Sequence, residues 1–303
     1  MALVSVVVPT YDRAHTLRAS LESLLGQTGV SFEVVVVDDG SGDDTPALLA
    51  SVRDPRLRVL RVPHGGIAAA RNAGIAAGRT PYVAFHDSDD LALPGRLAAP
   101  VALLAAHPEV DLVMQNGRML PADDDPQGGE APWIRPEVAA RLAARPVGVA
   151  EVFRWNLGQL QGMTFRRRAL EAVGPLDPSF TILDDLDLVL RVCVHHRAAF
   201  LDVPAFAYRR HAGGIARDRA RVREESIRLA DKLVEEHPEV LDLLGPSVFR
   251  RRQARRWASL ALMRARAGNA AAARAALGRA CRLDPANLRY RLRALWLRLR
   301  PTG

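Results

Sequence analysis

Three carboxylates lie within four residues of one another in the segment AFHDSDD, at residues 84–90. Asp87, Asp89 and Asp90 follow directly on an apolar run at 82–85. Like charges this close repel one another, so they need a compensating partner. A helix N-cap needs one carboxylate, whereas Mg²⁺ or Mn²⁺ binds carboxylates and completes its shell with water and phosphate oxygens. We therefore expect the three carboxylates to serve a divalent metal that holds a nucleoside diphosphate.

Two other apolar runs also end in polar residues. VVVPTYDR ends in Thr10, Tyr11 and Asp12, and VVVVDDGSGDDT ends its apolar part in Asp38 and Asp39 before a Gly-Ser turn. In an open parallel α/β sheet, ligands bind beyond the carboxyl ends of the strands. The three polar run ends therefore predict one ligand site at a single edge of a sheet.

The first half of the chain alternates between strand-like and helix-like stretches. Apolar runs rich in β-branched residues occupy residues 3–8, 32–37, 57–62, 82–85 and 110–114. Stretches rich in alanine and leucine lie between them, at residues 17–25, 47–52, 67–77 and 97–106. This alternation predicts an α/β fold with a mostly parallel sheet flanked by helices. Runs such as VVVV are apolar on both sides, as a sheet covered on both faces requires.

The second half of the chain has a different organisation. Residues 117–135 are rich in Pro, Gly and Asp and predict an exposed, mobile loop. Residues 136–215 predict helices near 136–143 and 184–194, a strand near 161–166, and two short strands near 199–201 and 205–208. From residue 216 onward the sequence predicts helices only. We expect two domains, 1–215 and 216–303, the second with either a helical appendage or one tetratricopeptide-like helical pair.

Composition limits the class of protein. The chain has 303 residues, of which 49% are hydrophobic, enough for a large core and more than one domain. No apolar run approaches the roughly 18–20 residues of a membrane span, and the N-terminus has no signal-peptide pattern. Cys193 and Cys281 are far apart and are expected to be reduced thiols. We expect a cytoplasmic protein, with the inner face of the plasma membrane as an alternative location.

Positive charge is concentrated in the last part of the sequence. Residues 250–303 contain fifteen arginines and one acidic residue, Asp284, a net charge of +14 in a chain whose total is +8. Within NLRYRLRALWLRLR, helical spacing places five apolar residues on one face: Leu288, Leu292, Leu295, Trp296 and Leu299. Such a stripe among arginines predicts either peripheral contact with an anionic membrane or packing on the preceding helices.

Several segments occur in an order typical of one enzyme family. VSVVVPTYDR, VVVVDDGSGDDT, GIAAARNAG and FHDSDD are followed, after residue 135, by LQGMTFRRRALEAVGPLDPSF, LDDLDLVLRV and YRRHAGGIAR. Together they resemble the family 2 glycosyltransferases over about residues 3–215. The resemblance implies a GT-A fold with a mixed, mostly parallel sheet. It also implies the inverting transfer of a sugar from a nucleoside-diphosphate sugar, of UDP type, to a hydroxyl acceptor, with Mn²⁺ or Mg²⁺ as cofactor.

The resemblance implies that residues 1–116 bind the nucleotide sugar. Asp39 would lie near the base and Arg71 near the base or the diphosphate. Asp87 and Asp89 would form the Asp-x-Asp pair, with Asp87 toward the ribose and Asp89 on the metal, and His211 would be a further metal or diphosphate contact. The other implied nucleotide-sugar contacts are Pro9, Thr10, Tyr11, Asp12, Arg13 and Ser88.

Residues 136–215 would form the acceptor half. The resemblance implies that Asp185 is the general base, beside Asp184, which replaces the glutamate usual in the family. If the register slips by one residue, Asp184 is the base instead. The implied acceptor-side residues are Trp155, which stacks on a sugar or packs in the core, Gly162 and Met163. The family's acceptors include glycans and lipid-linked sugars.

Three other kinds of protein could share parts of this pattern. A sugar nucleotidyltransferase of the same fold, or a dinucleotide-binding dehydrogenase, needs a glycine-rich loop after the first strand, and PTYDRAHT has no glycine. A degenerate transferase domain could act as a scaffold, with the arginines on nucleic acid. Only three aromatic residues interrupt those arginines, and all the proposed catalytic carboxylates are present. We therefore expect an enzyme and no nucleic-acid partner.

Overall fold

The chain forms two compact units, Met1–Gly214 and Ile215–Gly303. The computed structural model describes residues 2–121, 130–209 and 218–299, and it describes side chains as far as residue 295. None of the helices in these ranges has both the length and the apolarity that a membrane span requires.

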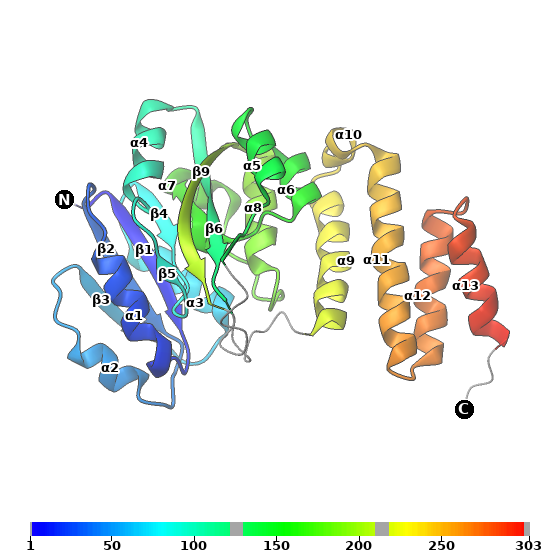
Figure 1. Cartoon of the computed structure of the whole chain (residues 1–303), viewed down its shortest axis with the longest axis horizontal. Helices are drawn as coiled ribbons and strands as arrows, with labels where there is room; N and C mark the ends of the chain where they lie inside the picture. The colour runs from blue at the N-terminus through cyan, green and yellow to red at the C-terminus, as the bar shows by residue number, and fades with distance from the viewer. Residues whose placement is uncertain (1, 122–129, 210–217, 300–303) are drawn as a thin grey trace. The chain divides into compact units, whose positions relative to one another are not determined.

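A mixed sheet forms the centre of the first unit (Figure 1). Its strand order in the described residues is β3-β2-β1-β4-β8-β6-β9-β5, with β7 beside β6. Four neighbouring strands are parallel: β1 (Val4–Thr10), β2 (Phe32–Asp38), β3 (Leu57–Arg61) and β4 (Tyr82–Phe85). The other strands are β5 (Leu91–Ala92), β6 (Val110–Met119), β7 (Ala131–Pro132), β8 (Met163–Arg166) and β9 (Arg197–Tyr208). Strand β8 is antiparallel to both β4 and β6, so it joins the parallel half to the rest of the sheet.

Helices cover both faces of the parallel strands, as the apolar runs predict. The first four are α1 (Ala14–Leu25), α2 (Thr45–Ser51), α3 (Ile67–Ala77) and α4 (Ala98–Ala106). Val6 and Val34 belong to the buried cluster that contains Leu17 of α1. Val35 points to the other face and packs with Ala70 of α3. Helix α3 lies so close to the sheet that a Cβ added at Gly74 would come within 2.3 Å of the Val7 side chain.

The second half of this unit departs from the sequence prediction in two places. Its helices are α5 (Pro136–Ala143), α6 (Val149–Trp155), α7 (Arg167–Val173) and α8 (Asp184–His195), with a short 3₁₀ turn at Leu160–Gly162. The loop expected over 117–135 is strand at both ends, because β6 extends to Met119 and pairs there with β7. Residues 122–129 lie outside the described part.

One continuous strand, β9, replaces the two short strands expected near 199–201 and 205–208. The apolar signal is interrupted by the segment Asp202-Val203-Pro204, and proline cannot donate a ladder hydrogen bond. The sheet accommodates this segment by shifting the register between β9 and β6 around Asn116. The Asn116 side-chain amide also donates to an Asp202 carboxylate oxygen at 3.1 Å, so polar side-chain contacts replace part of the ladder.

The second unit is helical throughout its described residues. Its helices are α9 (Arg219–Glu236), α10 (Val240–Leu244), α11 (Pro246–Arg266), α12 (Ala270–Leu283) and α13 (Leu288–Leu299). Helices α11, α12 and α13 lie side by side in chain order (Figure 1). Small side chains such as Ala258 and Ala276 allow close packing of α11 on α12. Between them the chain turns at Gly268 and Asn269, and the Asn269 side chain accepts a capping hydrogen bond from the Ala272 amide at 3.0 Å.

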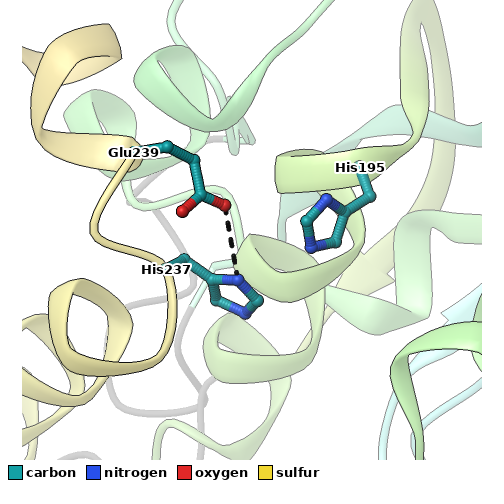
Figure 2. Close-up of side chains that lie close together, drawn as sticks. All are labelled: His195, His237 and Glu239. Carbon is teal, nitrogen blue, oxygen red and sulfur yellow. Dashed lines mark ion pairs between the residues drawn. The ribbon is translucent and has the colours of Figure 1, made fainter.

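A polar contact lies between helices α9 and α10. Nδ1 of His237 is 3.6 Å from a carboxylate oxygen of Glu239 (Figure 2). The two residues form an ion pair whenever the imidazole is protonated. The contact therefore links the residue that follows α9 to the residue that precedes α10.

Candidate active site

The three polar strand ends meet at one edge of the sheet. Thr10, at the end of β1, pairs with Asp38 at the end of β2. On the other side of β1, Val7 pairs with Phe85, the last residue of β4. Since all three strands are parallel, the residues that follow them leave the sheet at the same edge. This arrangement confirms the convergence that the sequence predicts.

Asp12 joins the loops that follow β1 and β2. Its amide donates to the Ser41 hydroxyl at 3.0 Å, and its Oδ1 accepts from the amides of Gly42 at 2.8 Å and Asp43 at 3.3 Å. The backbone φ of Asp12 is 50°, a left-handed conformation that aspartate tolerates better than most residues. Asp12 therefore holds the two loops together at the edge of the site.

Asp39 fixes the start of helix α3. Its two carboxylate oxygens accept from the amides of Gly65 at 2.8 Å and Gly66 at 2.9 Å. Gly66 has a φ of 87°, which favours glycine at the position before the helix. A carboxylate at a helix N-terminus is also stabilised by the helix dipole. Asp39 thus positions the helix that carries Arg71.

Arg71 bridges two carboxylates from distant parts of the sequence. Its Nη1 donates to Asp184 at 2.9 Å and its Nη2 donates to Asp87 at 3.0 Å. The guanidinium is buried, which by itself would lower the pKa of Arg71, but the negative charges of Asp184, Asp87 and Asp185 raise that pKa above its ordinary value. The arginine therefore stays charged and links the end of β4 to the start of α8.

The carboxylates after β4 are compensated in three different ways. Asp87 pairs with Arg71, and a carboxylate oxygen of Asp89 lies 3.5 Å from Nε of Arg13. Burial raises the pKa of Asp90, and the charges of Asp87 and Asp89 raise it further. Asp90 is therefore held toward its neutral form. Two arginines and the raised pKa of Asp90 thus relieve much of the repulsion.

The same carboxylates fit a divalent metal with few protein ligands. The side chains of Asp87 and Asp89 are 24% and 19% exposed, so solvent and a ligand can reach their oxygens. Among the residues described, no three carboxylates at this edge bring oxygens within 4.8 Å of one another. Mg²⁺ commonly takes one or two protein carboxylates and fills its shell with water and phosphate oxygens. The donor set therefore suits Mg²⁺ or Mn²⁺ bound together with a diphosphate, while His211 lies outside the described residues.

Asp184 and Asp185 begin helix α8 in different surroundings. Asp184 is buried and accepts from Arg71, whereas Asp185 is half-buried. Burial and the adjacent Asp184 raise the pKa of Asp185 to about 8, although Arg71 opposes this shift. Asp187, one turn further on, pairs with Arg191 at 2.9 Å. The raised pKa of Asp185 is typical of a carboxylate in an acid–base site.

The side chains that follow β1 and β3 form an aromatic pair at the same edge. The rings of Tyr11 and His64 lie 4.3 Å apart at an angle of 31°, and Tyr11 is 43% exposed. His64 had no assigned role in the sequence, because a single histidine after a short strand carries no pattern. Thr10 and Ser88 are buried beside this edge, as is Pro9 within β1. The exposed ring is therefore available to a planar ligand group.

The acceptor-side residues lie at different depths. Trp155 is half-buried on α6, whereas Gly162 and Met163 are buried. A Cβ at Gly162 would lie 2.8 Å from the Gln115 carbonyl oxygen, so close packing requires glycine there. The Met163 side chain belongs to the core. Gly162 and Met163 therefore support the site from within the fold.

Arg96 is a functional candidate that the sequence did not indicate. It is fully buried and donates to the carbonyl oxygens of Phe85 at 3.0 Å and Met163 at 2.7 Å, and to the Thr164 hydroxyl at 3.0 Å. Burial lowers the pKa of Arg96 to about 9. These bonds tie Phe85, at the end of β4 and two residues before Asp87, to β8. In the sequence, Arg96 is only a single basic residue between Gly95 and Leu97 in an otherwise apolar segment.

Part of the chain is similar in sequence to known glycosyltransferases. A model of glycosyl transferase family 2 matches residues 5–134. The succinoglycan biosynthesis protein ExoO of Rhizobium meliloti (strain 1021) is 44% identical over 124 residues, which are 39% of this chain and 36% of that protein. The UDP-Glc:alpha-D-GlcNAc-diphosphoundecaprenol beta-1,3-glucosyltransferase WfgD of Escherichia coli is 34% identical over 103 residues, 34% of this chain and 41% of that protein. The matches thus span well under half of these two relatives.

Solved structures show the same fold at lower sequence identity. S. aureus TarS 1-349 in complex with UDP-GlcNAc aligns with a TM-score of 0.62 at 20% identity, over 77% of this chain and 66% of that one. The mannosyltransferase PcManGT from Pyrobaculum calidifontis, in complex with GDP-Man and Mn²⁺, aligns with a TM-score of 0.62 at 21% identity, over 98% and 84%. Residues 5–134 therefore match the model of glycosyl transferase family 2, and the unit that contains them has the GT-A fold.

Proposed function

We propose that this chain is an inverting glycosyltransferase that moves a sugar from a nucleoside-diphosphate sugar to a hydroxyl acceptor. The observation that carries the proposal is the bridge through Arg71 between Asp87 and Asp184. The bridge joins the loop of Asp87 and Asp89, which suits a metal and a diphosphate, to helix α8. Helix α8 begins with a second carboxylate pair, Asp184 and Asp185. A donor and an acceptor held on these two sides would meet across one short distance.

The reaction needs one proton acceptor and one means of stabilising the leaving group. The acceptor oxygen forms a bond to the anomeric carbon while the bond to the diphosphate oxygen breaks on the opposite side, which inverts the configuration. Asp185 takes the proton of the attacking hydroxyl as a general base. Mn²⁺ or Mg²⁺, held by Asp89 and the diphosphate, would neutralise the charge that develops on the leaving group.

The chain's own residues position the two substrates. Tyr11, exposed beside His64, offers a ring surface to the base of the nucleotide. Asp39 and Arg71 hold helix α3 and the two carboxylate groups in place. Asp184 is already occupied by Arg71, so Asp185 is the carboxylate that remains for the acceptor. This difference supports Asp185, and not Asp184, as the base.

The comparisons suggest classes of substrate. The structural neighbours bind UDP-GlcNAc in one case and GDP-Man with Mn²⁺ in the other. ExoO is named for the biosynthesis of a polysaccharide, and WfgD is named for transfer from UDP-Glc to a sugar linked to diphosphoundecaprenol. We propose a UDP- or GDP-sugar donor and, as acceptor, a hydroxyl of a growing glycan or of a lipid-linked sugar.

A thermal-shift screen tests the proposal without knowledge of the acceptor. A ligand that binds only the folded protein raises its melting temperature in proportion to the logarithm of ligand concentration over Kd. We expect at least one nucleoside diphosphate, or its sugar, to raise the melting temperature more with Mn²⁺ than without it. If no member of a panel of UDP-, GDP-, ADP- and dTDP-sugars shifts the melting temperature, the protein does not use such donors.

A further inference from the structure

Helix α13 exposes a line of leucines. Leu288 and Leu292 are each 66% exposed and Leu295 is 55% exposed, although leucine is usually buried. Their spacing of four and three residues places them on one face of the helix. We call these three residues the leucine stripe. The sequence allowed the stripe to pack on the preceding helices, and for these three residues that alternative is wrong.

A different face of α13 packs against α12. Tyr290 is 8% exposed and belongs to a buried cluster with Ala276 and Leu277 of α12, and Ala294 packs against the same cluster. Helix α13 is therefore attached to its own unit through Tyr290 and Ala294. The leucine stripe is not needed for that attachment, so a substitution in it should leave the fold intact.

Arginines border the stripe. Arg289, Arg291 and Arg293 alternate with its leucines along the chain, and all three are exposed. No acidic residue occurs between positions 285 and 303. The surface therefore combines exposed leucines with exposed arginines, and positive charge borders an apolar centre.

We propose that the leucine stripe and these three arginines bind the surface of an anionic membrane. Leucines on an amphipathic helix insert at the boundary between headgroups and acyl chains, and arginines beside them contact lipid phosphates. A second copy of the same face would bring like charges together, which opposes self-association. A nucleic acid would contact the arginines but would leave the leucines exposed to water.

This inference does not depend on the proposed transfer reaction. Binding to vesicles requires no donor, no metal and no catalytic carboxylate, so it can succeed or fail independently of activity. If both proposals hold, the membrane surface would bring the enzyme to lipid-linked acceptors.

Co-sedimentation of the full chain with vesicles tests the inference. The probes are vesicles of phosphatidylcholine alone and vesicles of phosphatidylcholine mixed with phosphatidylglycerol. We expect binding to the mixed vesicles at low salt, weaker binding at high salt because salt screens the attraction, and little binding to phosphatidylcholine alone. A protein that remains in the supernatant with mixed vesicles at low salt overturns the inference.

Two matched sets of arginine substitutions locate the binding face. Each arginine near an anionic surface adds about fivefold to the partition constant, so replacing Arg289, Arg291 and Arg293 together by Gln should lower it about a hundredfold. The control replaces three exposed arginines of α11, Arg250, Arg251 and Arg255, by Gln and removes the same charge. The control should retain most of the binding. An equal loss in both triple variants would mean that net charge alone attracts the chain, and it would overturn the assignment to α13.

A pair of leucine substitutions tests the apolar part. Leu292→Gln should lower the partition constant about tenfold, because one leucine no longer inserts. The control is Leu262→Gln, at a leucine of α11 that is 43% exposed. Both variants should keep the wild-type melting temperature. If Leu292→Gln binds vesicles as well as the wild type does, the leucine stripe does not insert into the membrane. The same conclusion follows if the wild-type chain is a dimer in solution and Leu292→Gln, but not Leu262→Gln, is a monomer.

Discussion

The guanidinium of Arg71 donates to the carboxylate of Asp184 at 2.9 Å, although the two residues are 113 positions apart in the chain. The same guanidinium also reaches Asp87. One buried cation therefore fixes the distance between the strand end that carries the Asp-x-Asp pair and the helix that carries the proposed base. Breaking this link should change both binding and folding.

Substitution of Arg71 tests that link. Arg71→Met leaves Asp87 and Asp184 without their shared partner, and removal of one member of a buried ion pair costs roughly 3–5 kcal/mol. We expect a lower free energy of unfolding by urea denaturation, together with loss of nucleotide-dependent thermal shifts. Arg58→Met, at an exposed arginine of β3, is the control and should leave both unchanged. A stable Arg71→Met variant with normal nucleotide binding would show that the bridge has no such role.

Asp89 is the carboxylate assigned to the metal. Asp89→Asn removes a charged oxygen ligand, and it should abolish most of the gain in nucleoside diphosphate affinity that Mn²⁺ produces in the wild type. Calorimetric titration of the nucleotide with and without Mn²⁺ measures this gain. Asp44→Asn, at an exposed position of the loop after β2, is the control. The same enhancement by Mn²⁺ in Asp89→Asn and wild type would refute the assignment.

The raised pKa of Asp185 predicts a dependence of stability on pH. Burial, together with Asp184, raises this pKa to about 8 from an ordinary value of 3.8, so the folded state binds the proton more tightly than the unfolded state does. Stability from this group is therefore present at low pH and is lost as pH rises from about 4 to about 8. Asp185→Asn carries no charge at any pH and should have a higher melting temperature than wild type near pH 8, with the difference shrinking toward pH 4.

A control variant at the surface separates the effect of Asp185 from a general dependence of stability on pH. Asp242→Asn, at an exposed position of α10, should follow the wild-type melting curve at every pH. A difference between Asp185→Asn and wild type that does not change with pH would mean that Asp185 keeps an ordinary pKa in the folded protein.

Arg96 should contribute to stability through its hydrogen bonds. Arg96→Met removes the hydrogen bonds from the guanidinium to the carbonyl oxygens of Phe85 and Met163, and each hydrogen bond from a charged group contributes about 1.5–3 kcal/mol. Loss of the buried charge offsets part of this cost. We expect the free energy of unfolding in urea to fall by about 2–4 kcal/mol. A variant at least as stable as wild type would show that the desolvation of Arg96 outweighs its hydrogen bonds.

Much of the fold was predictable because its signals are local. Strands β1, β2 and β4 are short, β-branched and apolar on both sides, and each ends in polar residues that are out of place in a core. Strand β9 was predicted in two pieces because Pro204 interrupts its apolar pattern. The sheet tolerates the proline through a register shift with β6, which depends on a partner strand more than eighty positions earlier in the chain.

The site was predictable in its residue types but not in its pairings. Carboxylates that follow a strand are unusual enough to indicate a ligand site, and that inference needs no tertiary information. The bridge from Arg71 to Asp184, and the burial of Arg96 behind β4, arise only when distant elements pack together. The sequence predicts a metal as the compensation for Asp87, Asp89 and Asp90, whereas the structure shows two arginines and a raised pKa of Asp90.

We propose that Asp185 activates the attacking hydroxyl in an inverting displacement. Without an acceptor, water can take its place, so proton NMR can follow the sugar released from an α-linked UDP- or GDP-sugar that the thermal-shift screen identifies. We expect the β-anomer to form first. Asp185→Asn should retain donor binding but release sugar about 10²–10⁴-fold more slowly, the usual contribution of general base catalysis. Asp184→Asn should lose less of this activity. Initial release of the α-anomer, or a greater loss in Asp184→Asn than in Asp185→Asn, would show that Asp185 is not the general base of an inverting reaction.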